Sequence, residues 1–225
     1  MPVVQQLGVA RLGRNLIWLA GLSACAPERY TEAFYPEGDI REVVVLGDAG
    51  DVVVETAARL RVERTIHGAE RALSLSHSVE SGALVLESRC DGLLPCSVDV
   101  RVEVEESVPV FIVLDNGDVL IRDINHAEVE LSRGTVRVEE AGDLKIRLGQ
   151  GDVHGSVKDG GMIDVVVAEG DVEMEIPAGP WKADIEADLE TVVGLESRDE
   201  SERDLSVVAH GGEVTLRSST PFASR

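Results

Sequence analysis

Four aspartates that directly follow a glycine have the residue type and spacing best suited to cation binding: Asp118, Asp143, Asp152 and Asp171. If their turns stack, the carboxylates form a column, and a hard cation such as Ca²⁺ would relieve their repulsion through oxygen ligands. The spacing differs from the G-G-x-G-x-D repeat that binds calcium, and aspartate also stabilises turns by bonding to neighbouring backbone N–H groups. We therefore expect a structural role for these residues, with weak cation binding as the alternative.

No arrangement of residues in the sequence indicates catalysis. The five histidines are scattered, and none forms the H-E-x-x-H pair that binds zinc on a helix: His67, His77, His126, His154 and His210. The sequence also lacks a nucleophile elbow and a P-loop. Gly149-Gln150-Gly151 is a lone G-x-G between expected strands, so we interpret it as a turn rather than a dinucleotide site. The chain is therefore expected to be non-enzymatic and to bind no cofactor.

Cys90 and Cys96 flank a segment that contains the glycine and proline typical of a reversing turn. Outside the cytoplasm such a pair usually forms a disulfide. Closing the seven-residue ring would stabilise the fold by about 2.4 kcal/mol at most, from the entropy of loop closure. A metal site built on the two cysteines is the alternative, but histidine or further cysteine ligands are missing nearby.

The N-terminus has the layout of a secretory signal. Arg11 and Arg14 precede a short apolar stretch at 16–22, and the sequence Leu22-Ser23-Ala24-Cys25 follows. The stretch is shorter than the roughly 20 apolar residues that span a bilayer as a helix. The last four residues match the bacterial lipobox, whose cysteine is lipidated and becomes the first mature residue in proteins that bear it. We expect a signal peptide at 1–24 and lipidation of Cys25; the alternative is a buried helix with an incidental cysteine.

The charge limits which surfaces the protein can bind. The formal net charge is −21, and removing residues 1–24, which carry two arginines and no acid, gives −21 − 2 = −23. So acidic a chain is not expected to bind nucleic acid, because phosphates require a basic surface. Anionic lipid headgroups should repel it as well. Attachment to the membrane must then come from acyl chains, each buried methylene contributing about 0.8 kcal/mol.

Short β-branched runs separated by glycine-rich turns predict a mainly β protein. From Val119 to Val172 a strand begins about every nine residues, since (172 − 119)/6 is close to nine. Units that bury their apolar side only by stacking are typical of repeat proteins, and the 3% aromatic content suits a thin aliphatic core. We predict a tether at 25–39, a mixed β cap at 40–108 with a helix within 67–78 and a disulfide hairpin, a parallel β-solenoid (β-helix) at 109–217, and a tail at 218–225.

The repeat units resemble those of a known family. G-D-V-x-[VI] units recur, and they are approached by an alternating strand at 98–104, Val108-Pro109, Phe111-Ile112-Val113 and then Gly117-Asp118-Val119. Over roughly residues 40–217 the chain is similar to the β-strand-repeat "putative adhesin" family, a domain of unknown function in bacterial envelope proteins. The resemblance implies a β-helical fold and no established activity. The spacing here is irregular, and some turns lack glycine, as at Ala127.

Together these features predict a lipid-anchored protein of the bacterial envelope that presents a solenoid surface to an envelope or surface protein, in adhesion, scaffolding or sensing. Ala26 after the lipidated cysteine indicates sorting to the outer membrane in a cell with two membranes. The main alternative is a polysaccharide-binding or polysaccharide-active β-helix protein, although Phe111 and Trp181 are nearly the only rings in the repeat region. A self-associating coat is a third possibility, because the end strands of a solenoid can pair.

Overall fold

The computed structural model describes residues 29–68, 73–90, 95–158 and 160–219, and these residues form eighteen strands and no helix. Most paired strands run parallel to each other. Only the pairs β1–β4, β4–β7 and β5–β6 are antiparallel. The prediction of a mainly β fold with mostly parallel strands is therefore confirmed. In the described part of the chain, no helix has the length and apolarity to cross a membrane.

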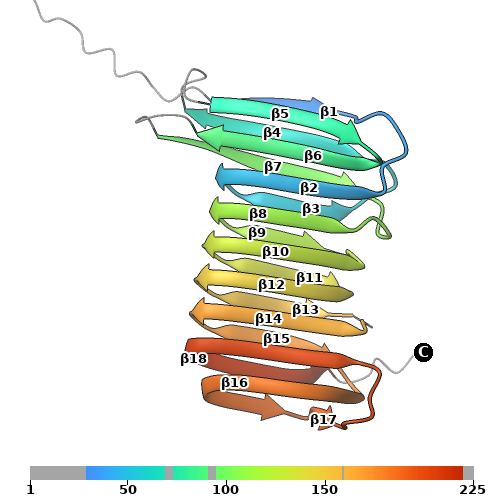
Figure 1. Ribbon diagram of the computed structural model, residues 1–225, viewed down its shortest axis with the longest axis vertical. Helices are drawn as coiled ribbons and strands as arrows, with labels where there is room; N and C mark the ends of the chain where they lie inside the picture. The colour runs from blue at the N-terminus through green and yellow to red at the C-terminus, as the bar shows by residue number, and fades with distance from the viewer. Residues whose placement is uncertain (1–28, 69–72, 91–94, 159, 220–225) are drawn as a thin grey trace, which may run out of the picture.

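The strands form two ladders that face each other across one core (Figure 1). The front ladder contains, in spatial order, β5 (Leu73–Glu80), β6 (Ala83–Cys90), β2 (Glu42–Ala49), β8 (Val110–Asn116), β10 (His126–Arg133), β12 (Asp143–Gln150), β14 (Met162–Glu169), the first half of β18 (Asp204–Ser219) and the first half of β16 (Pro180–Val193).

The back ladder contains β1 (Arg29–Phe34), β4 (Arg61–Gly68), β7 (Cys96–Val104), β3 (Val52–Thr56), β9 (Val119–Arg122), β11 (Val136–Ala141), β13 (Val153–Val157), β15 (Val172–Pro177) and the second halves of β18 and β16. The short strand β17 (Glu196–Ser197) pairs with the start of β16. We call one front strand and the back strand that follows it a layer of the stack.

Alternation along each strand places aliphatic side chains in columns inside the stack. Val43, Val110, Ala127, Leu144 and Ile163 are aligned through successive front strands, and all five are fully buried. Among the described residues, the buried apolar side chains are aliphatic except for Met174 and Trp181. The low aromatic content of the sequence therefore matches a core only two side chains thick.

Glycine is required at the turns between front and back strands because the turns of adjacent layers lie in contact. Gly117, Gly134 and Gly151 all have φ between +132° and +142°. A Cβ atom at Gly134 would lie 1.8 Å from the carbonyl oxygen of Gly117, and one at Gly151 would lie 1.8 Å from that of Gly134. No side chain fits there, so the G-D-V turns of the sequence mark one continuous column of backbone contacts.

The spatial order of the layers differs from the order in the chain. Val43 of β2 pairs with both Leu84 of β6 and Val110 of β8, so β2 and β3 lie between strands that follow them in sequence. At the other end, β18 lies between β14 or β15 and the earlier strand β16. The ladders continue without a break between the predicted cap at 40–108 and the repeat that follows it, since β2 and β3 pair with β8 and β9. Strand β1 also occupies part of the predicted tether at 25–39.

Two local predictions are wrong. The described residues within 67–78 belong to the end of β4 and to β5 rather than to a helix, because Leu73 and Leu75 pack against the core and pairing with β6 overrides helix propensity. Residues 69–72 of the predicted helix lie outside the described residues. The disulfide hairpin is also absent: β6 pairs with β2 and β5, whereas β7 pairs with β3 and β4. The two strands therefore belong to different ladders, β6 to the front ladder and β7 to the back ladder.

Candidate functional site

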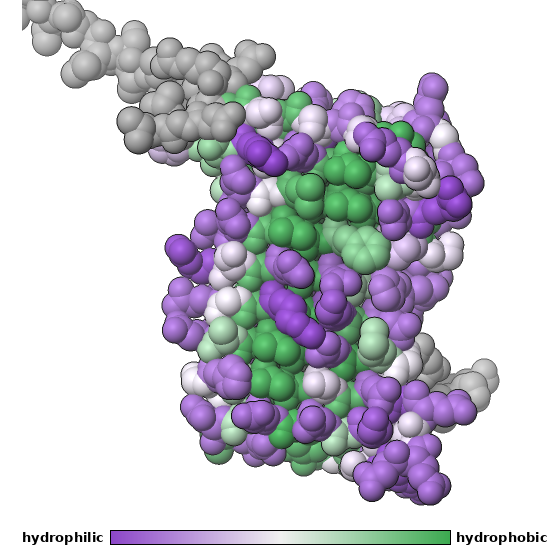
Figure 2. All heavy atoms as spheres, viewed as in Figure 1, coloured by the Kyte–Doolittle hydropathy of each residue, from purple (hydrophilic) through white to green (hydrophobic). Residues whose placement is uncertain are grey.

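An apolar area on the outer surface of the front ladder is the main candidate for a binding site. It comprises the outward side chains of β6, β2 and β8, namely Val44, Leu46, Val85, Phe111 and Val113, which we call the front patch. Val44 is in register with Val85 on one side and Phe111 on the other, and Leu46 is in register with Val113. All five are partly exposed, Val113 by 42%. Figure 2 shows the apolar area over these strands, in the upper half of this face.

The sequence produces this patch by making the strands apolar on both sides. In β2 and β8 the runs Val43-Val44-Val45-Leu46 and Val110-Phe111-Ile112-Val113-Leu114 have no polar residue on the outward positions. In β7, by contrast, strict alternation gives an apolar inner and a polar outer surface. The front patch is not among the sites predicted from the sequence, although the unbroken apolar runs of β2 and β8 are the signal that could have revealed it.

Charged side chains bound the front patch. Glu87 lies in register with Leu46 on one side, and Glu130 lies in register with Val113 on the other. Glu128 lies in register with Phe111 and forms an ion pair with Lys145 of the next layer, and Arg147 of that layer forms one with Asp164. A shallow hollow of about 460 Å³ opens beside the patch, and it is lined by Leu46, Gly47, Asp48, Glu87, Ser88, Arg89, Val113 and Asp115. The apolar area thus ends at a mainly acidic border.

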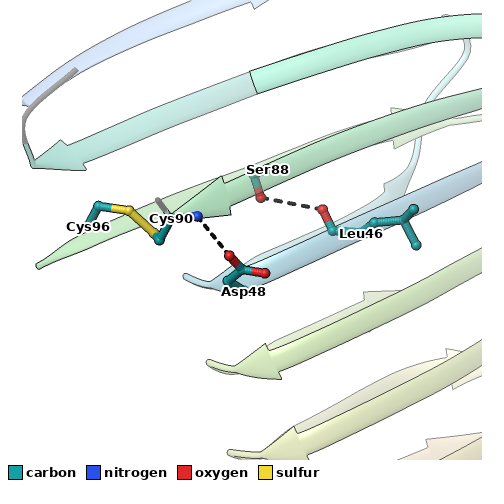
Figure 3. The surroundings of a disulfide bond; sticks show 5 residues. All are labelled: Leu46, Asp48, Ser88, Cys90 and Cys96. Carbon is teal, nitrogen blue, oxygen red and sulfur yellow. Dashed lines mark hydrogen bonds between the residues drawn. A yellow bond between two sulfur atoms is a disulfide. The ribbon is translucent and has the colours of Figure 1, made fainter. Parts of the chain in front are cut away.

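The predicted disulfide is present at the edge of this hollow. Cys90 and Cys96 are bonded, with their Cα atoms 5.9 Å apart, and they join the end of β6 to the start of β7. The N–H of Cys90 donates a hydrogen bond to Oδ2 of Asp48 at 2.7 Å, and the Ser88 hydroxyl donates to the Leu46 carbonyl at 3.4 Å (Figure 3). The disulfide therefore fixes the corner between the ladders where β6 meets β2.

Three of the four glycine-linked aspartates lie in one column. Oδ1 of Asp118 accepts a hydrogen bond from the N–H of Thr135 at 2.8 Å, and Oδ1 of Asp152 accepts one from the N–H of Asp171 at 3.0 Å. Asp171 in turn accepts from the N–H of Glu213 at 2.8 Å. Each carboxylate therefore binds the backbone of the equivalent turn in the next layer.

Asp143 lies apart from that column. It is in register with His126, at the corner where back strands lead into front strands, and its Oδ1 accepts from the N–H groups of Gly161 and Met162. Thr135 also separates Asp118 from Asp152 within the column. In the described residues, no group of three or more histidine, cysteine, aspartate or glutamate side chains is placed to hold a metal ion. The geometry thus gives each aspartate a backbone partner.

The five histidines lie on five different strands. Nε2 of His67 is 2.7 Å from Asp99, His77 stacks on Phe34, and the His126 ring centroid is 6.1 Å from that of Phe111. His154 lines a shallow polar hollow of about 550 Å³ on the back ladder, together with Arg137, Glu139, Glu173, Glu175 and Arg217 among others. Trp181 is buried, and its indole N–H donates to the Pro177 carbonyl at 3.0 Å. It therefore offers no platform for a sugar ring.

Cys25 and the predicted signal peptide lie outside the described residues, as do residues 220–225 of the predicted tail. The acylation prediction therefore depends on the sequence motif alone.

Comparison with known proteins yields matches among solved structures. No family model matches the chain, and no curated protein does so either. A structure described as a "putative cell adhesion protein" from Clostridium sporogenes ATCC 15579 is similar over 86% of this chain and 100% of its own, at 12% identity and a TM-score of 0.54. This chain shares that protein's fold. The resemblance to the "putative adhesin" family is thereby confirmed at the level of the fold.

A "putative adhesin" from Parabacteroides merdae ATCC 43184 is similar over 86% of this chain and 97% of its own, at 10% identity and a TM-score of 0.44. A "putative lipid binding protein" from Parabacteroides distasonis ATCC 8503 covers 85% and 97%, at 15% identity and a TM-score of 0.41. At these scores neither structure adds to what the first one shows.

Proposed function

We propose that the protein is a non-enzymatic, lipid-anchored envelope protein whose front patch binds a protein partner. The observation that carries this proposal is the set of five outward apolar side chains on adjacent strands β6, β2 and β8. Single exposed apolar residues are common on any protein, but contiguous patches with a polar border are typical of interaction sites. The five residues form such a contiguous group.

The border of the front patch indicates the chemistry of the partner. Glu87, Glu130 and Asp115 surround the apolar residues, and the chain as a whole is strongly acidic. Complementary charge speeds association and excludes wrong partners. We therefore expect an apolar surface with basic side chains around it, such as a strand or helix with lysine or arginine beside its apolar face.

The architecture supports a display role. We interpret the two parallel ladders, which contribute one strand each to successive layers, as a β-solenoid, the fold that the sequence predicts. A solenoid presents long, rigid outer surfaces to partners. The lipobox at Cys25 supports anchoring in the envelope, with outer-membrane sorting where two membranes exist, and the description of the similar Clostridium structure as a cell adhesion protein supports a role at the cell surface.

A photo-crosslinking residue at Val113, the most exposed residue of the front patch, tests this function in intact cells. The matched control carries the same residue at Arg137, which is exposed on the back ladder. We expect the Val113 probe to capture one envelope or surface protein that the Arg137 probe does not, and the added substitution Phe111→Glu to abolish the capture. Equal capture from both positions, or none from either, would contradict the proposal.

A further inference from the structure

The N-terminal end of the stack is closed by a cover of aromatic and polar side chains. Strands β1 and β5 are the last strands of the two ladders at this end (Figure 1). The Phe34 ring stacks on His77 with centroids 4.4 Å apart. Arg64, whose side chain is only 3% exposed, forms an ion pair with Glu32 at 3.6 Å and donates a hydrogen bond to the Ser76 carbonyl at 2.7 Å. The end of the core is therefore sealed by these side chains.

Amphipathic residues are exposed around this cover. Tyr30 is 40% exposed, Tyr35 52% and Val79 41%, and the Arg59 guanidinium lies 4.4 Å from the centroid of the Tyr35 ring. Three of the five aromatic side chains among the described residues are at this end, in a protein otherwise poor in rings. Tyrosine prefers the headgroup level of a bilayer, where its ring is apolar and its hydroxyl hydrated, and arginine can extend its guanidinium toward phosphates.

Chain length places the same end beside the expected lipid anchor. Only residues 26–28 separate Cys25 from Arg29, the first residue of β1. A fully extended chain spans at most about 3.6 Å per residue, so an acylated Cys25 holds β1 within roughly 14 Å of the membrane surface.

Charge distinguishes the two ends of the stack. Residues 180–204, which include β16 and β17 at the opposite end, contain nine acidic and three basic side chains. Residues 29–41 together with Arg59 contain three of each. The front ladder has nine strands, and a spacing of about 4.8 Å puts its ends roughly 40 Å apart. That separation is several times the Debye length of about 8 Å at physiological ionic strength. An upright stack therefore keeps its acidic end beyond the repulsion of anionic lipids, and a stack lying flat does not.

We propose that the N-terminal end of the stack binds the headgroup region of a phospholipid bilayer through Tyr30, Tyr35 and Val79, so that the stack stands upright on the membrane. This inference rests on the proposed acylation of Cys25, and it assigns to the protein a second, direct contact with lipid. In this orientation the long axis of the stack is perpendicular to the membrane, and the front patch faces sideways. A partner that moves along the membrane surface can then reach the patch.

The test separates orientation from acylation. In the processed chain, residues 25–225, which contains every described strand, Cys25 is the one thiol outside the disulfide and can be coupled to a maleimide phospholipid. The coupled protein is placed on vesicles that contain a photoactivatable phospholipid, and the cross-linked peptides are mapped by mass spectrometry. We expect cross-links within residues 29–41 and 73–80, and at least about fivefold fewer on residues 180–204 or on the front patch.

Two matched triple variants complete the test. Tyr30→Ser/Tyr35→Ser/Val79→Ser should lower the lipid cross-links at the N-terminal end at least about fivefold. Leu189→Ser/Val192→Ser/Val193→Ser, which changes three exposed apolar residues at the opposite end, should leave them unchanged. Thermal unfolding checks that both variants fold. Cross-links spread evenly over the stack, or concentrated on its acidic end, would overturn the upright orientation, whereas an unacylated N-terminal peptide from native envelopes would overturn only the proposed anchor.

Discussion

The carboxylate of Asp118 accepts a hydrogen bond at 2.8 Å from the backbone N–H of Thr135, which occupies the equivalent turn of the next layer. The same relationship joins Asp51 to Asp118, Asp152 to Asp171 and Asp171 to Glu213. Side chains of one layer thus satisfy backbone donors of the next at the turns, where strand pairing does not reach every N–H. The aspartates of the G-D-V units are explained by this contact without a bound cation.

Substitutions at Asp118 can distinguish a role in hydrogen bonding between turns from a role in cation binding. Asp118→Asn keeps an oxygen acceptor for the Thr135 N–H and should change the free energy of unfolding little. Asp118→Ala removes the acceptor and should cost about 1 kcal/mol, the usual value of such a hydrogen bond. Urea unfolding measures both values. A melting temperature of the wild-type protein that rises by several degrees with Ca²⁺, and no longer does so in Asp118→Asn, would instead establish a cation site.

Gly134→Ala should destabilise the protein by more than about 3 kcal/mol, because the new Cβ atom would lie 1.8 Å from the Gly117 carbonyl oxygen and φ is +142°. Gly211→Ala is the matched control. Its φ is +69°, but no heavy atom lies within 4 Å of the added Cβ, so the expected cost is only that of the backbone conformation, about 1 kcal/mol. Similar losses for the two variants would show that the turns of adjacent layers are not in contact.

Loss of the disulfide should weaken the N-terminal layers. Cys90→Ser/Cys96→Ser should lower the free energy of unfolding by about 2 kcal/mol, close to the entropic limit for a ring of this size. Calorimetry of the variant and of reduced wild-type protein should give the same lowered melting temperature. The Val113 cross-link should also weaken, since the Cys90 N–H is bonded to Asp48 beside the front patch. An unchanged melting temperature on reduction would contradict this role.

Arg64→Ala should cost about 2 kcal/mol, because it removes the hydrogen bond to the Ser76 carbonyl and the packing beneath Phe34. Burial lowers the pKa of the Arg64 guanidinium, and the nearby Glu32 carboxylate opposes that effect. Arg41→Ala is the control, because the Arg41 side chain is largely exposed and also bonds to a single carbonyl, that of Ser81. We expect it to cost less than about 0.5 kcal/mol in urea unfolding. Equal costs would show that Arg64 does not seal the core.

The repetitive parts of the fold can be predicted from the sequence, because each unit carries its own signals. Gly117, Gly134 and Gly151 mark the turns, and the alternating valines that follow them define the inner surface. The disulfide between Cys90 and Cys96 is equally local. The position of β2 between β6 and β8 is not predictable in this way, because many strands have similar edges and the residues of β2 do not specify which of them it pairs with.

The front patch as a whole, too, cannot be predicted from local sequence patterns. Val44 and Val85 are unremarkable in sequence, and only the register between β2 and β6 brings them together with Phe111. Composition favours a helix within 67–78, whereas pairing of Leu73 and Leu75 with β6 decides the outcome. Local patterns therefore predict strands, and long-range register decides which outer surface they build.

The position of β18 has a consequence for the order of folding. Strand β18 (Asp204–Ser219) follows every other described strand in the chain, yet it lies between β14 or β15 and the earlier strand β16. Strands that pair in chain order can therefore extend the two ladders only as far as β15, and β16 joins the stack only once residues 204–219 are in place. We expect a chain that is cut before residue 204 to leave the core uncovered next to β14 and β15.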